Sequence, residues 1–176
     1  MANQKRIIIG GITGGIGSAL ARRLTEAGHT VAGFARDAER LENLSNELGG
    51  FTYESCQATD SAAVETTVGS LVEALDGVDA YVHAIGSIYL KPAHLVGDDD
   101  WAKTLDVNLN SAFYALRSVV KRMQKQGTGG NCLFYSTAAA QAGIANHEAI
   151  AAAKGGIEAM VRSAASTYSS RGLRIN

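Results

Sequence analysis

A glycine-rich turn between an apolar strand and an amphipathic helix is the feature that most constrains the fold of this chain. Residues 7–9 are three consecutive isoleucines, the composition of a buried parallel strand. Glycines follow at positions 10, 11, 14, 15 and 17, and helical spacing of apolar residues begins at residue 18. Strand, glycine turn and helix in this order open a βαβ unit, and the helix N-terminus favours a pyrophosphate. The turn therefore predicts a dinucleotide-binding site.

Length, charge and cysteine usage narrow the class of protein. A chain of 176 residues with 46% hydrophobic content can bury the core of a single domain, expected over residues 1–176. The net charge of −1 predicts neither a nucleic acid nor a membrane as partner, and residues 1–4 do not resemble a signal peptide. Cys56 and Cys132 lack metal-ligand spacing and are expected to be buried thiols. We expect a cytoplasmic protein without a metal site.

Strand-like and helix-like segments alternate along the chain. Residues 30–35, 51–56, 78–85 and 131–135 are predicted strands, and residues 101–126 and 147–170 are predicted to be long helices. Asp37 and Asp60 are the expected N-caps of the two helices between the early strands. This alternation predicts an α/β fold, a doubly wound parallel sheet of Rossmann type in three layers.

The end of the second predicted strand indicates which dinucleotide is preferred. A carboxylate at this position accepts a hydrogen bond from a ribose 2′-hydroxyl, whereas an arginine accommodates a 2′-phosphate. Here Ala35 is uncharged and Arg36 is basic, so NADP(H) is favoured over NAD(H). The alternative is that Arg36 is a solvated side chain near a helix start.

Polar residues at strand ends and inside helices are the remaining candidates. Asn108 lies within a predicted helix, where asparagine is unfavourable without a positional reason. Ser136 and Thr137 follow the fifth predicted strand, at the edge where open α/β sheets bind ligands. Lys154 is the one charged residue in a patch of small residues. His83, inside a strand, is interpreted as a core histidine.

In these motifs the chain resembles the short-chain dehydrogenase/reductase family over essentially all of its length. The family's T-G-x-x-x-G-x-G corresponds to residues 10–17 with Gly10 in place of threonine, and its N-N-A-G corresponds to residues 83–86, where the glycine alone is kept. Its adenine-reading D-V corresponds to residues 57–58. The resemblance implies that the cofactor is bound by Gly11, Thr13, Gly14, Gly15, Ile16, Gly17, Arg36, Gln57, Ala58, Ala84, Gly86 and Lys154.

The same resemblance assigns catalytic positions. Asn108 matches the family's helix asparagine, Thr137 its catalytic serine and Lys154 its lysine, which holds the nicotinamide ribose. The family's tyrosine, which protonates the carbonyl oxygen as hydride arrives, is here Ile150. Isoleucine has no proton to give, and His147 and Tyr135 are the nearest polar stand-ins.

Two functions follow from this resemblance. The first is an NADP(H)-dependent oxidoreductase acting on a small-molecule carbonyl/alcohol pair, similar to a 3-oxoacyl reductase. The alternative is a dinucleotide-binding protein with impaired catalysis, serving as a sensor or inactive subunit. The family's assembly implies a homodimer or homotetramer formed by residues 101–126 and the small residues 151–156. Residues 171–176 resemble the family's G-I-R-V-N, so the chain is expected to end at the start of a sixth strand, as a fragment or without its tail.

Overall fold

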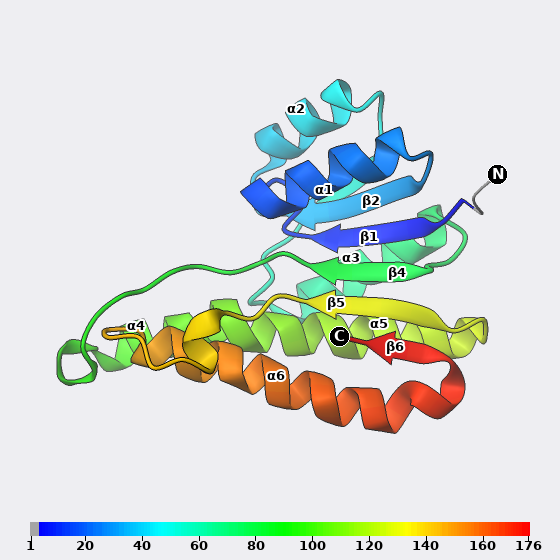
Figure 1. Cartoon of the computed structure of the whole chain (residues 1–176). Helices are drawn as coiled ribbons and strands as arrows, with labels where there is room; N and C mark the ends of the chain where they lie inside the picture. Colours follow the sequence, from blue (N-terminus) through cyan, green and yellow to red (C-terminus); the bar gives the residue numbers. More distant parts are fainter. Residues whose placement is uncertain (1–3) are drawn as a thin grey trace.

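Parallel strands in the order β3-β2-β1-β4-β5-β6 form the centre of the computed structural model, which describes residues 4–176 (Figure 1). The strands are β1 (Arg6–Gly10), β2 (Thr30–Ala35), β3 (Thr52–Ser55), β4 (Ala80–His83), β5 (Gly130–Phe134) and β6 (Leu173–Ile175). The order reverses between β1 and β4, which pair with Ile9 opposite Val82. The prediction of a doubly wound Rossmann-type sheet is confirmed.

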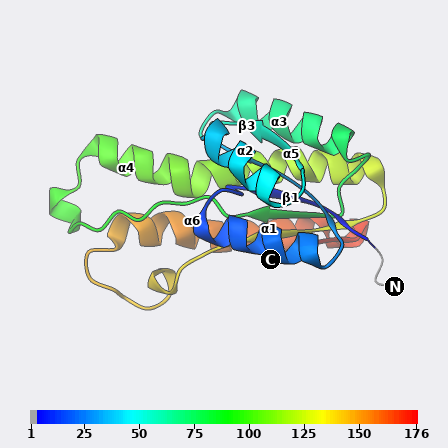
Figure 2. The same cartoon turned by 90° about the horizontal axis from the view of Figure 1, so that it is seen from above.

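Helices cover both faces of the sheet. The helices are α1 (Gly15–Glu26), α2 (Ala38–Glu47), α3 (Ser61–Ala74), α4 (Asp98–Leu105), α5 (Ser111–Gln126) and α6 (Glu148–Tyr168). Ile7 and Ile9 pack in an apolar cluster with α1 and α2, whereas Ile8 packs on the opposite face with α3, α5 and α6. Seen from above, α1 lies on one side of the sheet and α3 and α5 on the other (Figure 2).

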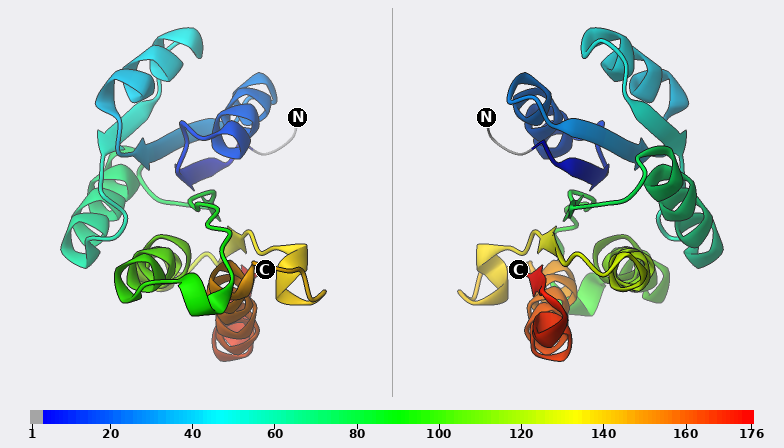
Figure 3. Two further views of the ribbon diagram at one scale, coloured as in Figure 1. Left: turned by 90° about the vertical axis from the view of Figure 1, so that its left-hand side faces the viewer. Right: turned by 90° about the vertical axis from the view of Figure 1, so that its right-hand side faces the viewer.

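The alternating burial of β1 explains this three-layer arrangement, because successive side chains of a strand point to opposite faces. Seen nearly along the strands, α5 and α6 are almost end-on beside the β4–β6 half of the sheet (Figure 3). α4 and the beginning of α6 extend past the carboxyl ends of the strands (Figure 1). Helices therefore flank the carboxyl end of the sheet.

The long helix predicted over residues 101–126 is interrupted. It consists of α4, a π-helical turn (Asp106–Asn110, called the π-turn below) and α5, and it begins at Asp98 rather than at residue 101. Side-chain hydrogen bonds of Asn108 and Ser111 within this segment, described below, account for the interruption.

The other element boundaries differ by a few residues. β4 ends at His83 rather than residue 85, because its partner β1 ends at Gly10, which pairs with His83. β3, at the edge of the sheet, is likewise shorter than residues 51–56, and β5 is one residue earlier than predicted. α6 lies within residues 147–170 and is followed by a 3₁₀ turn, Ser169–Arg171.

The smaller sequence predictions about caps and cysteines are confirmed. The Asp37 carboxylate accepts a hydrogen bond from Arg40 N, and the Asp60 carboxylate accepts from Ala62 N and Ala63 N. Cys56 and Cys132 are buried free thiols. Residues 1–3, on which part of the signal-peptide prediction rests, lie outside the described residues.

The described residues contain neither a membrane-spanning helix nor a metal-binding cluster. Within residues 4–176 no helix is long and apolar enough to cross a membrane. The same residues contain no group of three or more His, Cys, Asp or Glu side chains that could hold a metal ion.

The glycine turn gives a test of the local packing. A Cβ on Gly17 would lie 2.3 Å from the Gly11 carbonyl oxygen and 2.9 Å from Ile12 Cα, whereas a Cβ on Gly15 would meet nothing within 4 Å. Gly17→Ala should therefore lower the free energy of unfolding by about 1–3 kcal/mol, the usual cost of overpacking. Gly15→Ala is the matched control and should stay within about 0.5 kcal/mol of the wild type. Urea unfolding measures both, and equal stabilities of the two variants would contradict this account of the turn.

Candidate active site

The glycine turn packs directly against the chain that leaves β4. Gly11 has φ of +77° and its N–H donates to the Phe34 carbonyl at 2.8 Å. A Cβ on Gly11 would lie 2.8 Å from Ile85 Cγ1 and 2.9 Å from the Ala84 carbonyl oxygen, so no larger side chain fits there. Gly11 and Ala84, both predicted cofactor residues, are thereby brought together between β1 and β4.

The start of α1 offers backbone donors. Its N-cap, Gly14, provides no side-chain acceptor to the first-turn amides, and Gly15 and Ile16 are exposed at this point. Gly17 is buried against Gly11, which fixes the start of the helix at the turn. A helix N-terminus with free N–H groups suits a phosphate group.

Two arginines follow β2, and sequence reasoning singled out the first of them, Arg36, but not the second, Arg40. Arg36 is exposed immediately after β2, as predicted, and the Asp37 carboxylate is occupied by capping α2. In the first turn of α2, Arg40 Nη2 donates to the Thr13 carbonyl oxygen at 2.7 Å. Helical spacing does not link Arg40 to Arg36, because α2 begins at Ala38, after Arg36. The Arg40 guanidinium thus lies against the Thr13 backbone, and the exposed Arg36 precedes the same helix.

The two residues matched to the adenine-reading pair lie at the end of β3. Gln57 is exposed and Ala58 is buried. Ala58 belongs to the apolar cluster on the α3 face of the sheet, so its side chain serves the core.

Asn108 and Lys154 converge at Gly86. The Asn108 Oδ1 accepts from Ser87 N at 2.9 Å, and its Nδ2 donates to the Thr104 carbonyl at 3.0 Å. A Cβ on Gly86 would lie 3.1 Å from Asn108 Oδ1 and 3.4 Å from Lys154 Nζ. Residues from the π-turn, from α6 and from the segment after β4 therefore meet at one point.

Lys154 is buried but keeps donors free. Its Nζ donates to the Tyr135 carbonyl oxygen at 3.0 Å, and burial lowers the pKa of its ammonium group. A lysine ammonium has three donors, and the structure shows one of them in use. Two donors remain for acceptors such as ribose hydroxyls.

Thr137 has its hydroxyl proton available. Its Oγ1 accepts from Ala139 N at 3.3 Å. The neighbouring Ser136 donates to Glu158 Oε1 at 2.8 Å, and Gln141 Nε2 donates to Glu158 Oε2 at 3.2 Å. These two bonds lower the pKa of Glu158 and tie the loop after β5 to α6, one turn beyond Lys154. Sequence reasoning missed Glu158, although its i+4 spacing from Lys154 places both on one face of α6.

Ile150 is buried one turn before Lys154, with 5% of its surface exposed. The two polar stand-ins differ in their surroundings. His147 is half-buried at the start of α6, and its Nδ1 hydrogen-bonds to the Ala145 carbonyl at 2.8 Å. Tyr135 packs against the apolar cluster on the α1/α2 face, and its carbonyl is what contacts Lys154.

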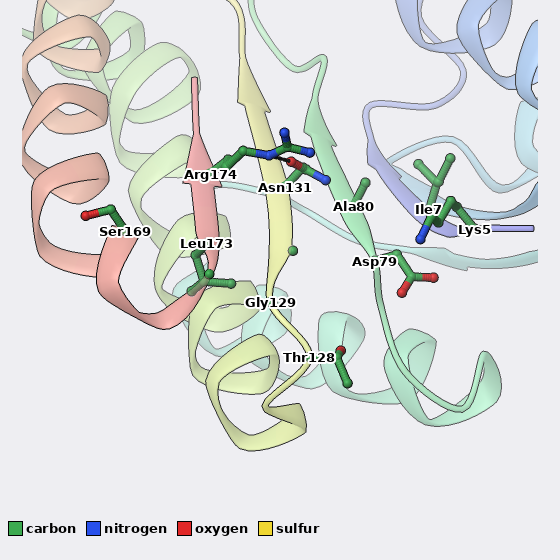
Figure 4. A pocket seen from close by; sticks show the side chains of 12 residues that line it. Lys5, Ile7, Asp79, Ala80, Thr128, Gly129, Asn131, Ser169, Leu173 and Arg174 are labelled. Carbon is green, nitrogen blue, oxygen red and sulfur yellow. Dashed lines mark hydrogen bonds between the residues drawn. The ribbon is translucent and has the colours of Figure 1, made fainter. Parts of the chain in front are cut away.

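A hollow of about 500 Å³ lies at the opposite end of the sheet from this site (Figure 4). Lys5, Asp79, Asn131 and Arg174 line it, and Arg174 Nε donates to Asn131 Oδ1 at 2.6 Å. Ligands of open α/β sheets bind beyond the carboxyl ends of the strands, and this hollow is at the amino ends. It is therefore not a part of the candidate site.

Comparison with known proteins agrees with the fold and the motifs. Residues 11–176 match the family model described as Enoyl-(Acyl carrier protein) reductase. The D-threitol dehydrogenase of Mycolicibacterium smegmatis is 30% identical over 98% of this chain and 67% of its own length. The 3beta-hydroxysteroid dehydrogenase of Mediterraneibacter gnavus is 30% identical over 99% of this chain and 64% of its own length. The chain thus spans about two thirds of these relatives.

Solved structures give the same result. An NAD+-bound xylitol dehydrogenase superposes with a TM-score of 0.93 at 30% identity, covering 99% of this chain and 68% of that one. A short chain dehydrogenase from Mycobacterium smegmatis superposes with a TM-score of 0.95 at 26% identity, covering 99% and 75%. The chain belongs to the short-chain dehydrogenase/reductase family.

Proposed function

We propose that this chain carries the cofactor-binding and catalytic scaffold of an NADP(H)-dependent oxidoreductase acting on a carbonyl/alcohol pair. The observation that carries the proposal is the meeting of Asn108 and Lys154 at Gly86, next to the glycine turn. Relatives named as dehydrogenases of D-threitol, a 3beta-hydroxysteroid and 2-dehydro-3-deoxy-D-gluconate support a small-molecule alcohol or ketone as substrate. A relative named as an NADP-dependent 3-hydroxy acid dehydrogenase supports a 3-oxoacyl compound. The two buried free thiols favour the cytoplasm as its location.

Each part of the dinucleotide has residues suited to it. The first-turn amides of α1 suit the pyrophosphate, Arg36 and Arg40 suit a 2′-phosphate, and the free donors of Lys154 suit the nicotinamide ribose. When bound, the nicotinamide supplies or accepts the hydride. The remaining chemistry belongs to the protein's own side chains.

The carbonyl oxygen of a substrate needs a hydrogen-bond donor and then a proton. The Thr137 hydroxyl serves as the donor, because its oxygen already accepts from Ala139 N and its proton is free. The residue matched to the family's tyrosine is Ile150, which has no proton to transfer. A positioned acid accelerates such a step by roughly 10²- to 10⁴-fold, so we propose that turnover is slow or uses another donor.

The buried, apolar Ile150 also favours a second function. A protein that holds the dinucleotide through the same residues but lacks the acid acts as a sensor or as the inactive subunit of an assembly. NADPH oxidation by the full-length protein, measured against ketones and 3-oxoacyl thioesters, distinguishes the two. Cofactor binding without turnover of any of these compounds supports the second function.

The cofactor preference rests on the two arginines. NADPH should bind more tightly than NADH in calorimetric titration, since a 2′-phosphate gains charge-assisted hydrogen bonds. Arg36→Ala and Arg40→Ala should each weaken NADPH binding at least about tenfold and leave NADH binding nearly unchanged. Arg23→Ala, at the last turn of α1, is the control and should change neither. Equal affinities for the two dinucleotides in the wild type would overturn the preference.

Restoring the acid tests the role of Ile150. Ile150→Tyr places a phenol one helical turn from Lys154, and we expect carbonyl reduction to rise by at least about tenfold. Because tyrosine is larger than isoleucine, circular dichroism and urea unfolding must first show that the variant folds. The missing-acid proposal fails if the wild type already turns over rapidly and the folded variant is no faster.

We also propose a homodimer or homotetramer formed through α4, α5 and α6. Phe113 on α5 and Trp101 on α4 are exposed, 47% and 42%, and a Cβ on Gly155 of α6 would meet nothing within 4 Å. Light scattering of the full-length protein at micromolar concentration should give two or four times the mass of one chain. A single-chain mass would contradict the proposed assembly.

A further inference from the structure

A chain of hydrogen bonds runs from the middle of the sheet through three buried side chains to a backbone carbonyl of the π-turn. The Tyr81 hydroxyl lies 2.8 Å from His83 Nδ1, and His83 Nε2 lies 3.2 Å from Ser111 Oγ. The Ser111 hydroxyl in turn lies 2.7 Å from the Val107 carbonyl oxygen. Tyr81, His83 and Ser111 are 0%, 1% and 0% exposed, so these side chains are shielded from bulk solvent. We call these four groups the relay.

The direction of every hydrogen bond in the relay follows from one group. A carbonyl oxygen only accepts, so the single proton of the Ser111 hydroxyl is given to Val107. Ser111 Oγ must therefore accept from His83, which fixes the histidine as the tautomer with its proton on Nε2. His83 Nδ1 is then an acceptor for the Tyr81 hydroxyl, whose pKa is raised by burial so that the phenol keeps its proton. Each hydrogen of the relay is used once.

His83 is neutral in this setting. Burial, with a smaller contribution from the Lys154 charge, lowers its pKa to about 3. A second ring proton would face the Tyr81 hydroxyl from His83 Nδ1 and reverse that bond. The relay is thus a fixed structural link over the ordinary range of assay pH rather than a titrating group.

The relay ends where the candidate active site begins. Val107 precedes Asn108 in the π-turn, and Ser111 N donates to the Asp106 carbonyl, the five-residue spacing of a π-helix. On the other side of this turn, Asn108 Nδ2 donates to the Thr104 carbonyl and Asn108 Oδ1 accepts from Ser87 N. The position of the Asn108 amide therefore depends on a turn that Ser111 holds from one side.

The relay also links two departures from the family pattern. His83 stands where the family's motif has asparagine, and Gly10 stands where it has threonine. A Cβ on Gly10 would lie 2.5 Å from the Tyr81 hydroxyl oxygen. The absence of a side chain at Gly10 leaves the space that the Tyr81 end of the relay occupies, so the two departures serve one set of hydrogen bonds.

We propose that His83 is a positioning residue that acts through Ser111 to hold the π-turn, and with it Asn108, in register against Ser87 and Lys154. The proposal rests on the proposed function only in that Asn108 belongs to the active site. The structural link from His83 to the Ser87 amide can be tested whether or not the protein reduces a carbonyl.

Hydrogen exchange of the Ser87 amide tests the link without any reaction. That N–H donates to Asn108 Oδ1, so its exchange rate reports whether Asn108 is in place. In His83→Phe and in Ser111→Ala we expect Ser87 to exchange faster by on the order of tenfold. The Thr30 amide, which donates to the Lys5 carbonyl oxygen at 2.9 Å at the amino end of the sheet, should be unchanged. NMR of the full chain resolves both amides.

A matched control separates the relay from general loss of packing. Val68→Ala removes buried methyl groups from the same apolar cluster at a position on α3, a helix that carries none of the relay residues, and it should leave Ser87 exchange at the wild-type rate. In the double variant His83→Phe/Ser111→Ala the acceleration should be no greater than in the more affected single variant, because both remove one link. If His83→Phe fails to fold, Ser111→Ala, which removes a single oxygen atom, decides the matter.

Kinetics of the full-length protein give a second measurement where it turns over. Both relay variants should lower kcat at saturating NADPH by about tenfold while the Kd for NADPH stays within about twofold. Unchanged Ser87 exchange in the folded variants, or equal acceleration in Val68→Ala, overturns the proposal. If Ser87 exchange accelerates in the relay variants but the wild-type protein reduces no carbonyl, the link is established and the proposed oxidoreductase function is wrong.

Discussion

The divergence of the chain after β1 and β4 is the constraint on which the rest of the structure depends. The two strands pair up to Gly10 and His83, and the Ala84 amide adds one further bond to the Gly10 carbonyl. Beyond that point one chain turns toward α1 and the other toward α4. The backbone atoms of Gly11 and Ala84 remain in close contact at the divergence. Candidate groups lie on both sides of this divergence, the arginines after β2 and Lys154 beside the chain that follows β5.

Local composition determines most of what could be predicted. The isoleucines of β1, the caps Asp37 and Asp60 and the glycine turn each depend on neighbours in the sequence, so they could be identified without the fold. The π-turn could not. Apolar spacing continues through residues 106–110. Distant groups contact this region, since Ser87 N bonds to Asn108 in the π-turn and His83 bonds to Ser111, the first residue of α5.

Contacts between residues far apart in the sequence explain why the sequence analysis missed two other residues of the candidate site. Arg40 follows Arg36 by four residues, and its guanidinium is held at the site by a contact with Thr13, which is 27 residues away. Glu158 likewise acts on a loop from another element. A sequence motif records the groups that touch a ligand more readily than those that hold the ligand-binding backbone in place. The site of this protein therefore has more supporting residues than its motif contains.

The fit between Gly10 and the Tyr81 hydroxyl constrains how this sequence can change over evolutionary time. A threonine at position 10 would place its Cβ 2.5 Å from that oxygen, and the β1 backbone is held by pairing on both sides. The same Cβ would lie 2.9 Å from Phe34 Cζ, so the residue at position 81 must shrink and the Phe34 ring must move before the residue at position 10 can grow. The reverse order passes through an intermediate with two overlapping atoms in the core. Descendants of this chain should therefore change positions 10 and 81 in a fixed order, and the first step toward the family's usual motif lies outside that motif.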